Sequence, residues 1–344
     1  MAAQSKTYTT LPKGSTILVT GANGSEHGYK VRGTTRSVEK NKWLVETFEK
    51  KYGKDVFELV EVKDMQVPGA FDKAVDGCAA VIHVATVITF DPDPESVIPP
   101  TLAGTNEILK AAAKTPSVTR VVYTSSTGAL QTTTESPLTV TQSTWNDEAI
   151  HLVQDPATFA TLPDANKSMV TYCASKTLAE KACFEFVEKE KPGFILNTVA
   201  PNMNTGPTIH PTQPASSSGG IKAAFLGNEK AFALMSSMGP MNYIDVRDTG
   251  RLHLAAAIFS DVQGERIWGV AGDYNFNDIV REFAKKDAKW KGKETEDEKR
   301  DLTVYDRSRS VELLRRLGRE GFISLEESIA DNLSDESSVE ANFY

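Results

Sequence analysis

Short apolar runs alternate along the chain with longer segments in which apolar residues recur every three or four positions. The short runs are rich in β-branched residues and nearly continuous in hydrophobicity, which is typical of parallel strands buried on both faces. The longer segments predict helices that cover such a sheet. The predicted strands are Ser15–Thr20, Tyr29–Gly33, Val56–Val62, Ala80–Val84, Arg120–Thr124 and Phe194–Val199. The predicted helices include Leu102–Lys114, Tyr172–Lys189 and Arg247–Phe259.

The character of the sequence changes beyond Pro201, where proline, serine and glycine become frequent before helical patterns return around Ser310–Leu317 and Ser324–Leu333. The pattern as a whole predicts an α/β fold. We expect a doubly wound parallel sheet in residues 1–200 and a smaller C-terminal cap in residues 201–344, with segments partly interleaved. The predicted loops are Asp91–Pro100, Gln131–Ala165 and Pro207–Gly220.

Composition and charge exclude several function classes. The 344 residues carry a net charge of −8, which argues against a nucleic-acid partner. No stretch approaches the ~18 apolar residues of a membrane helix, and the first residues lack an apolar signal core, so we expect a cytosolic protein without a membrane partner. Cys78, Cys173 and Cys183 suit a reducing compartment, and neither they nor the five histidines have metal-ligand spacing, so no metal is expected. The sequence gives no indication of an oligomeric state.

A glycine-containing turn follows the first predicted strand. Ser15–Thr20 runs directly into Gly21-Ala22-Asn23-Gly24. Glycines at the carboxyl end of a strand allow a tight turn and let backbone amides approach a pyrophosphate closely. An ordinary glycine turn has the same composition, but the position after an apolar first strand favours a nucleotide site that includes Gly21, Asn23 and Gly24. Residues 1–200 are therefore predicted to form a Rossmann-like, NADP-binding domain.

The connection to the second strand is unusually short. Only seven residues lie between Gly21 and Tyr29, whereas a parallel crossover normally takes a dozen or more. Because a helical residue advances only ~1.5 Å, we expect the first crossover helix to be truncated and the chain to be unable to return alongside the strand. The chain is either a splice or gene-model variant that lacks about eleven residues of such a crossover, which we favour, or a protein whose first crossover is rebuilt.

Basic residues follow the second predicted strand. Arg36 comes soon after Gly33, and Lys40 follows four residues later, whereas no Asp or Glu occupies the strand end. A basic side chain at this point can pair with the 2′-phosphate of NADP, and an acidic one would bind the free 2′-hydroxyl of NAD. A solvated basic turn is the other interpretation. The sequence favours NADP(H) as cofactor.

The ends of the third and fourth predicted strands supply the next candidates. Asp64 and Met65 are predicted to end the third strand, where an adenine edge would lie. Ala85 and Thr86 end the fourth, and their backbone is expected to face the cofactor. His83 is interpreted as a packed strand residue rather than as an acid–base group.

The most informative local pattern is Tyr172-Cys173-Ala174-Ser175-Lys176, which is predicted to open a helix. Tyr172 and Lys176 are four residues apart and therefore share one helix face. An ammonium close to a phenol stabilises the phenolate, so we expect Lys176 to lower the pKa of Tyr172 toward the working range and to make it a general acid for a carbonyl oxygen. Tyr172 and Lys176 are also predicted to contact the cofactor, with Lys176 holding the nicotinamide ribose. Many helices carry such a pair by chance on their surface.

Serine hydroxyls at the end of the fifth predicted strand strengthen this interpretation. Ligands of open α/β sheets bind in the crevice at the carboxyl ends of the strands. Ser126, in Tyr123-Thr124-Ser125-Ser126, is expected to hydrogen-bond a substrate carbonyl and to steady the developing alkoxide. Ser125 is the weaker candidate because adjacent side chains point in opposite directions. A pair of hydroxyls that caps the strand is the alternative.

These motifs together resemble the extended short-chain dehydrogenase/reductase family within the NAD-dependent epimerase/dehydratase superfamily. The branch most similar is the dihydroflavonol-reductase-like one, especially its fungal NADPH-dependent aldehyde and ketone (methylglyoxal-type) reductases. The resemblance covers nearly the whole chain, except the first crossover. It rests on Thr20–Gly24, Val81–Ala85, Gly104–Asn106, Tyr123–Ser126, Tyr172–Lys176 and Tyr243–Asp248, which occur in this order.

The resemblance implies that the chain transfers hydride from NADPH to a small aldehyde or ketone, with Ser126, Tyr172 and Lys176 as the catalytic set. It further implies that Arg36 and Lys40 bind the 2′-phosphate, that Asp64 lies near adenine, and that Pro201 and Asn202 flank the nicotinamide. The short 22–28 segment motivates an alternative, a non-catalytic homologue deficient in cofactor binding. A weaker alternative is a nucleotide-sugar epimerase or dehydratase.

Overall fold

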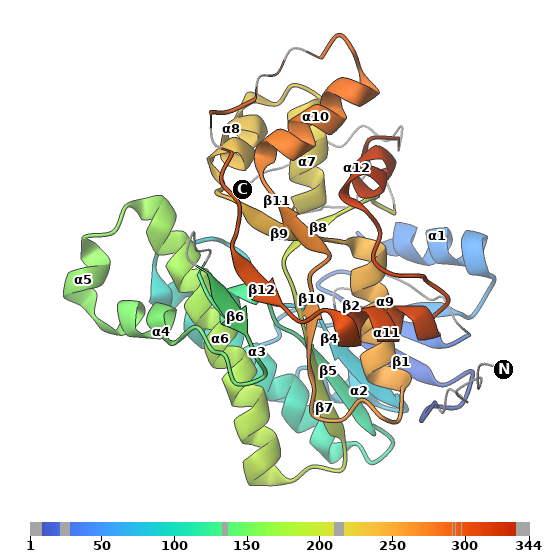
Figure 1. Cartoon of the computed structure of the whole chain (residues 1–344). Coiled ribbons are helices and arrows are strands. Elements are labelled where there is room, and N and C mark those ends of the chain that lie inside the picture. The colour runs from blue at the N-terminus through green and yellow to red at the C-terminus, as the bar shows by residue number, and fades with distance from the viewer. Residues whose placement is uncertain are drawn as a thin grey trace, which may run out of the picture. The chain divides into compact units, whose positions relative to one another are not determined.

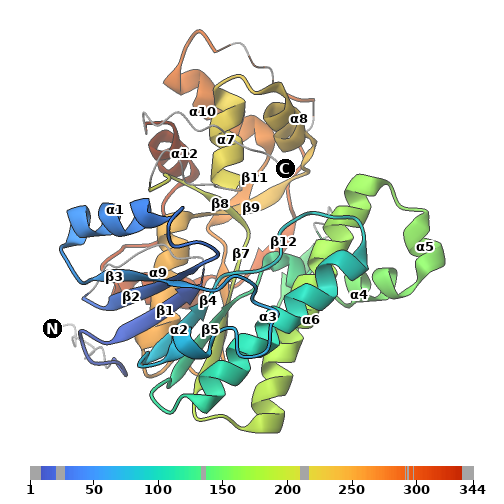
Figure 2. The same cartoon turned by 180° about the vertical axis from the view of Figure 1, so that it is seen from behind.

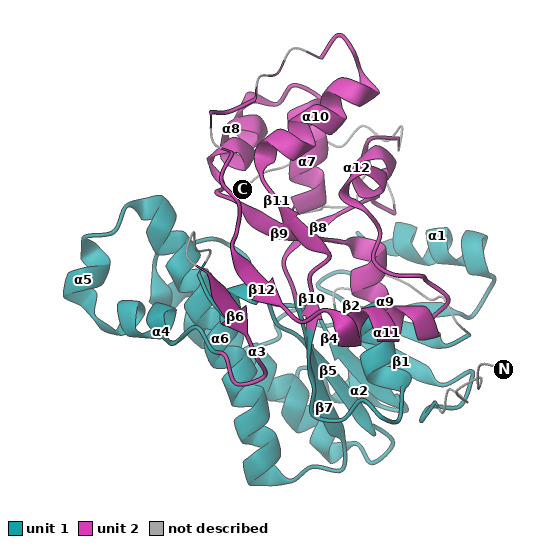
Figure 3. Ribbon diagram, viewed as in Figure 1, with its two compact units in different colours: residues 1–132, 145–200, 252–267 teal, residues 133–144, 201–251, 268–344 magenta. Residues whose placement is uncertain are grey.

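The computed structural model describes residues 9–20, 28–132, 137–209, 217–290, 292, 294–296 and 298–334. The chain forms two compact units (Figure 3). Unit 1 comprises Met1–Thr132, Trp145–Ala200 and Leu252–Ile267, and unit 2 comprises Thr133–Thr144, Pro201–Arg251 and Trp268–Tyr344. Among the described residues, no helix combines the length and apolar character needed to cross a membrane.

Unit 1 is built on a seven-stranded sheet with the order β10-β7-β5-β4-β1-β2-β3. The pairs from β7 through β3 are all parallel. The carboxyl ends of these strands therefore meet at one edge, and the order reverses direction between β4 and β1. The predicted Rossmann-like fold class is confirmed. The strands are β1 (Thr16–Thr20), β2 (Lys30–Thr35), β3 (Phe57–Glu61), β4 (Ala80–His83), β5 (Arg120–Thr124), β7 (Ile195–Pro201) and β10 (Arg266–Gly269).

Helices cover the sheet of unit 1, which explains why its strands are apolar almost throughout. α3 (Pro94–Lys114) and α6 (Asp164–Glu190) lie side by side (Figures 1 and 2). Val121 and Tyr123 of β5 pack into the core that these two helices share. The alternate residue Arg120 instead donates to the carbonyl of Val262, beyond α9 (Val246–Ile258). Unit 1 also contains α1 (Lys42–Tyr52), α2 (Asp72–Val75), η1 (Thr127–Ala129), α4 (Asp147–Gln154) and α5 (Pro156–Ala160).

The first crossover returns the chain in fewer residues than we expected. Residues 21–29 separate β1 from β2, and the two strands pair in parallel with Thr16 opposite Lys30 and Thr20 opposite Thr34. The expectation that so few residues cannot return was wrong because it used the helical rise. The return covers about 13 Å of strand, whereas ten extended peptide units can reach about 33 Å. Residues 21–27 themselves, including the predicted truncated helix, lie outside the described part of the chain.

Three predicted loops contain helices, so those predictions were wrong. α3 begins at Pro94, with Asp93 as its N-cap accepting from Glu95 N, and continues through Pro99 and Pro100. α4 and α5 lie in the predicted loop 131–165. In the predicted loop 207–220, α7 (Ser217–Phe225) starts at Ser217, whose hydroxyl donates to the carbonyl of Asn204. In α3, α4 and α7, burial of apolar side chains outweighs weak local helix propensity. α5 buries no residue and starts at Pro156, with Asp155 as its N-cap.

The prediction that Tyr172 opens a helix was also wrong, because α6 starts eight residues earlier, at Asp164. Residues 164–171 are largely polar and therefore carry little of the apolar period that marks a helix. Tyr172 and Lys176 both lie within α6 and are four residues apart, so they share one helix face as predicted.

Unit 2 contains a three-stranded sheet with the order β11-β9-β8 and a two-stranded sheet of β12 and β6. The helical patterns predicted near the C-terminus are confirmed as α11 and α12. The elements of this unit are β6 (Leu138–Val140), β8 (Met203–Thr205), α7, α8 (Glu229–Ser237), β9 (Met241–Asp245), β11 (Gly272–Tyr274), α10 (Phe276–Lys286), β12 (Thr303–Tyr305), α11 (Ser308–Arg316) and α12 (Leu325–Ser334), together with the first turns of α9.

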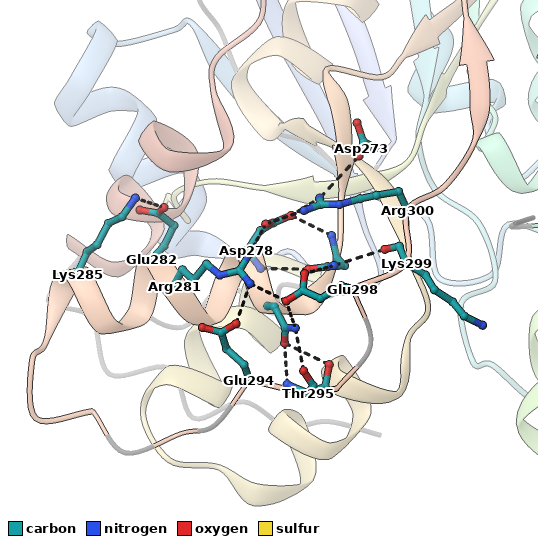
Figure 4. A network of polar contacts seen from close by, with 12 residues as sticks. Asp273, Asp278, Arg281, Glu282, Lys285, Glu294, Thr295, Glu298, Lys299 and Arg300 are labelled. Carbon is teal, nitrogen blue, oxygen red and sulfur yellow. Dashed lines mark hydrogen bonds and ion pairs between the residues drawn. The ribbon is translucent and has the colours of Figure 1, made fainter.

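Ion pairs hold the segment after α10 to that helix (Figure 4). Arg281 reaches Glu294 at 2.7 Å and Glu298 at 2.6 Å, and Arg300 pairs with Asp278. Because these side chains keep much of their surface exposed, water screens each pair and the pair contributes little to the stability of the fold. The network orders a surface segment and carries no site chemistry.

Candidate functional site

One threonine connects β1 and β4, the two strands between which the strand order of unit 1 reverses direction. Thr20 ends β1, and its hydroxyl oxygen lies 2.9 Å from His83 Nδ1 on β4. The same oxygen accepts from Val84 N and Ala85 N, each at 3.0 Å. Burial lowers the pKa of His83 to about 3, with a smaller contribution from Lys176, so the ring is neutral and its Nδ1 can accept the threonine proton. As expected, His83 is a buried strand residue.

Ala85 and Thr86 follow β4 rather than ending it, because the strand stops at His83. Thr86 offers a polar group without a partner just beyond this strand end. Its hydroxyl oxygen is buried and has no hydrogen-bond partner among the described residues. An orphaned polar atom at a strand end is what a bound ligand would satisfy. Ala85 and Thr86 therefore fit the predicted cofactor contact. The predicted contacts Gly21, Asn23 and Gly24 fall in the segment 21–27, outside the described residues.

Arg36 and Lys40 lie in the turn that follows β2, and both side chains are exposed. The turn is built by Thr35, whose hydroxyl oxygen accepts from Asn41 Nδ2 at 2.7 Å and from Ser37 N at 3.3 Å. These bonds fix the backbone between the two basic residues. Two cations on a fixed turn at a strand end are suited to a phosphate group.

Asp64 and Met65 follow β3 rather than ending it, because the strand stops at Glu61. Asp64 Oδ1 accepts from Gln66 N at 2.9 Å, which shapes the turn. Met65 packs on Gly104 of α3, where an added Cβ would lie 2.9 Å from Met65 Cγ and 3.0 Å from its Sδ. Gly104 thus lets the turn approach the helix closely, and the two predicted adenine contacts have a fixed support.

Ser126 and Tyr172 come together, although 45 positions separate them in the sequence. A Cβ added to Gly128 would lie 3.4 Å from Ser126 Oγ and 3.5 Å from Tyr172 Cε1, so the two side chains adjoin. Ser126 caps η1, and its Oγ accepts from Gly128 N at 3.1 Å. With one lone pair engaged, the Ser126 hydroxyl keeps its proton to donate. The Phe90 ring lies beside Tyr172 with centroids 5.5 Å apart.

The pKa of Tyr172 is not lowered, contrary to expectation. Burial raises it to about 12, and the hydrogen bond with Ser126 opposes that rise in part. The expected effect of Lys176 is not among the causes of this shift, because the ammonium is directed at β5. Tyr172 is consequently a protonated hydroxyl over the whole neutral range, which is the form that a proton donor requires.

Lys176 is buried, with 2 % of its surface exposed. Its Nζ donates to the carbonyl of Thr124 at 2.7 Å and lies 5.1 Å from the centroid of the Tyr123 ring. Burial lowers the pKa of Lys176 to about 8, while the charge of Glu180 acts in the opposite direction. The lysine thus fastens α6 to the end of β5, two residues before Ser126.

The geometry brings the three predicted catalytic residues to one place in unit 1. Two hydroxyl groups, of Ser126 and Tyr172, adjoin and can both donate to one oxygen atom, and a cation lies on the same helix face one turn from the tyrosine. This arrangement suits stabilisation of negative charge that develops on a carbonyl oxygen. Pro201 is the last residue of β7, and Asn202 follows with its Oδ1 accepting from Met203 N. Both belong to unit 2, and their predicted role stays a prediction.

Sequence reasoning missed three supporting residues: Thr20, Gly128 and Glu180. Thr20 could have been found as the hydroxyl residue directly before the glycine turn. Gly128 and Glu180 carry no such signal, because their contacts depend on the approach of α6 to β5. Among the described residues, no group of His, Cys, Asp and Glu gathers as metal ligands would.

Comparisons with known proteins identify the family of the chain. The profile of a family described as "Male sterility protein" matches residues 68–237. The chain is 39% identical to aldehyde reductase 2 of Sporidiobolus salmonicolor over 345 residues, which covers 95% of this chain and 97% of that protein. It is 33% identical to the ketoreductase adrE of Penicillium rubens, covering 95% and 98%. The crystal structure of the yeast methylglyoxal/isovaleraldehyde reductase Gre2 complexed with NADPH has a TM-score of 0.72 and 26% identity, and covers 93% of this chain and 97% of that one.

Proposed function

Since the chain belongs to the extended short-chain dehydrogenase/reductase family, we propose that it reduces the carbonyl group of a small aldehyde or ketone with NADPH as cofactor. The observation that carries this proposal is that the Ser126 hydroxyl, at the start of η1, adjoins Tyr172 of α6, the helix that Lys176 fastens to β5. The relatives named as aldehyde reductase and ketoreductase support the substrate class. We further propose a cytosolic location.

The two hydroxyls have different roles. The substrate carbonyl oxygen accepts hydrogen bonds from Ser126 Oγ and Tyr172 Oη, which polarises the carbon–oxygen bond. Tyr172 gives up its proton to the oxygen as that atom becomes an alkoxide. Lys176 fastens α6 to β5 and would hold the nicotinamide ribose. The product is the corresponding alcohol.

NADPH supplies the hydride, which no protein side chain can supply. Arg36 and Lys40 would hold its 2′-phosphate, and the exposed position of both on the turn after β2 leaves them accessible to it. Asp64 and Met65 would lie near its adenine, and the backbone of Ala85 and Thr86 would face the cofactor. The orphaned hydroxyl of Thr86 supports this fit.

Oxidation of NADPH in the presence of a panel of aldehydes and ketoesters tests the proposal. The chain is expected to turn over at least one of them, and Tyr172→Phe is expected to lower kcat by about 10²- to 10⁴-fold, the usual contribution of a general acid. Tyr52→Phe on α1 serves as the matched control and should retain activity. Turnover that survives Tyr172→Phe would reject the tyrosine as the acid.

Calorimetric titration with NADPH separates the proposal from a homologue that cannot hold the cofactor. Binding together with turnover supports the reductase. Absence of binding at submillimolar concentration would mean that the short connection 21–29 has disabled the nucleotide site.

A further inference from the structure

Glu180 is a fully buried carboxylate on α6 that none of the proposed catalytic steps uses. Its Oε2 accepts from Ser125 Oγ at 2.7 Å, and its Oε1 accepts from Thr198 Oγ1 of β7 at 2.6 Å. Arg266 of β10 adds a bidentate pair, with Nε at 2.9 Å from Oε1 and Nη2 at 3.0 Å from Oε2. Four donors therefore satisfy this carboxylate, which compensates for much of the cost of its burial.

The position of Glu180 relates it directly to the catalytic set. Tyr172, Lys176 and Glu180 follow one another at intervals of four residues and form one stripe of α6. The hydroxyl that Glu180 holds belongs to Ser125, the residue immediately before Ser126. One carboxylate therefore contacts the strand end that carries the serine, while the lysine lies one turn earlier on the same helix.

The charged and titratable groups around Lys176 identify what Glu180 contributes. Cys183 of α6, His83 of β4 and the Tyr123 ring of β5 also face the ammonium. Among these groups, Glu180 is the carboxylate, and its negative charge favours the charged form of Lys176. Burial of the lysine has the opposite effect. The positive charge of Arg266, which lies 3.7 Å from the centroid of the Trp145 ring, is balanced by the same carboxylate.

We propose that Glu180 is a positioning residue of the reductase site, which keeps Lys176 charged and holds Ser126 in register with Tyr172. The proposal rests on the proposed function for its catalytic meaning, but the charge of Lys176 is measurable without turnover. The competing explanation is an ion pair that only ties α6 to the edge strand. If that explanation holds, Arg266 and Glu180 contribute equally to stability, and the protonation of Lys176 does not depend on Glu180.

Two variants separate these explanations. Glu180→Gln keeps the shape of the side chain and an acceptor for Ser125, but it leaves Arg266 buried without its counter-charge. The double variant Glu180→Gln/Arg266→Met removes both charges and is expected to recover the melting temperature lost by the single variant. Glu185→Gln, on the same helix and exposed in a pair with Lys189, is the matched control.

The pH profile of kcat/KM is the first measurement. We expect its alkaline limb, which reports Lys176, to move to lower pH by about one unit or more in both Glu180 variants, with Glu185→Gln unchanged. A double variant that regains stability together with the wild-type profile would show that the ion pair is merely structural. An unchanged profile in a folded Glu180→Gln would overturn the proposal equally.

The second measurement needs neither cofactor nor substrate. The NMR chemical shifts of the Lys176 side chain in lysine-labelled protein, followed against pH and assigned by comparison with Lys176→Met, report the protonation of this buried amine in the free protein. The midpoint is expected near 8 in the native chain and lower in both Glu180 variants. Equal midpoints would refute the role of Glu180 even if the chain were an active reductase. A shifted midpoint in a chain without turnover would instead contradict only the proposed function.

Discussion

Replacement of Gly128 by alanine tests the packing behind the catalytic hydroxyls. An added Cβ would lie 3.0 Å from Cys173 Sγ, 3.4 Å from Ser126 Oγ and 3.5 Å from Tyr172 Cε1. Gly128 is not among the glycines with positive φ, so alanine suits its backbone and the effect comes from contacts alone. The sulfur contact is the tightest of the three, and Cys173 is buried on α6 next to Tyr172.

The magnitude follows from that contact. Overpacking of a filled interior costs about 1–3 kcal/mol, and we expect a loss of stability in the lower half of this range because the sulfur has to yield by only a few tenths of an ångström. A misplacement of 1 Å in an active site can lower the rate about 10²-fold. A shift of a few tenths of an ångström transmitted to Tyr172 should therefore lower kcat about three- to tenfold.

Urea unfolding and steady-state reduction kinetics measure the two effects. Gly193→Ala is the control, because its added Cβ meets no atom within 4 Å. Adding Cys173→Ala to Gly128→Ala removes the contacting sulfur and should restore kcat, with a coupling energy of about 0.5–3 kcal/mol in a double-mutant cycle. The reasoning fails if Gly128→Ala behaves as the control does, or if the two substitutions are simply additive.

Two further predictions concern charge. The folded-state pKa of Lys176 is about 8 and lies below the ordinary value of 10.5. Burial of the ammonium therefore lowers the free energy of unfolding by its full amount below pH 8. This destabilisation disappears as the pH rises from 8 to 10.5. Lys176→Met should therefore be inactive yet more stable than the native chain at pH 7 by about 1–3 kcal/mol. In urea unfolding, this gain in stability should shrink between pH 8 and 10.5. A gain that does not depend on pH would contradict the lowered pKa of Lys176. Arg36→Ala should raise the KM for NADPH about 10- to 150-fold, the equivalent of one charged hydrogen bond of about 1.5–3 kcal/mol, while the KM for NADH changes little; equal effects on both cofactors would exclude a 2′-phosphate contact.

Much of the fold could be predicted because both faces of the sheet are covered. Buried parallel strands read as continuous apolar runs, and the six predicted strands coincide with β1, β2, β3, β4, β5 and β7 to within a few residues. The helix starts could not be predicted as well. Pro99 and Pro100 suggest a break that α3 passes through, and the polar start of α6 hides its first two turns. In both cases tertiary packing outweighs local preference.

The candidate site was predictable where chemistry and spacing coincide. Tyr172 and Lys176 are close on any helix, and Ser126 follows from its place at a strand end. The pKa of Tyr172 was not predictable, because it depends on burial and on the direction of the Lys176 ammonium toward Thr124. Glu180 was missed for the same reason: its partners come from three different strands.

Transfer of deuterium from NADPH deuterated at the transferable position of the nicotinamide tests the proposed hydride transfer itself. With an aldehyde or ketone substrate, we predict one deuterium on the carbinol carbon of the alcohol, detected by mass spectrometry. We also predict that Tyr172→Phe, which keeps the aromatic ring and removes the acidic hydroxyl, forms almost none of this product. An alcohol without deuterium, or undiminished transfer by the phenylalanine variant, would contradict the proposed mechanism.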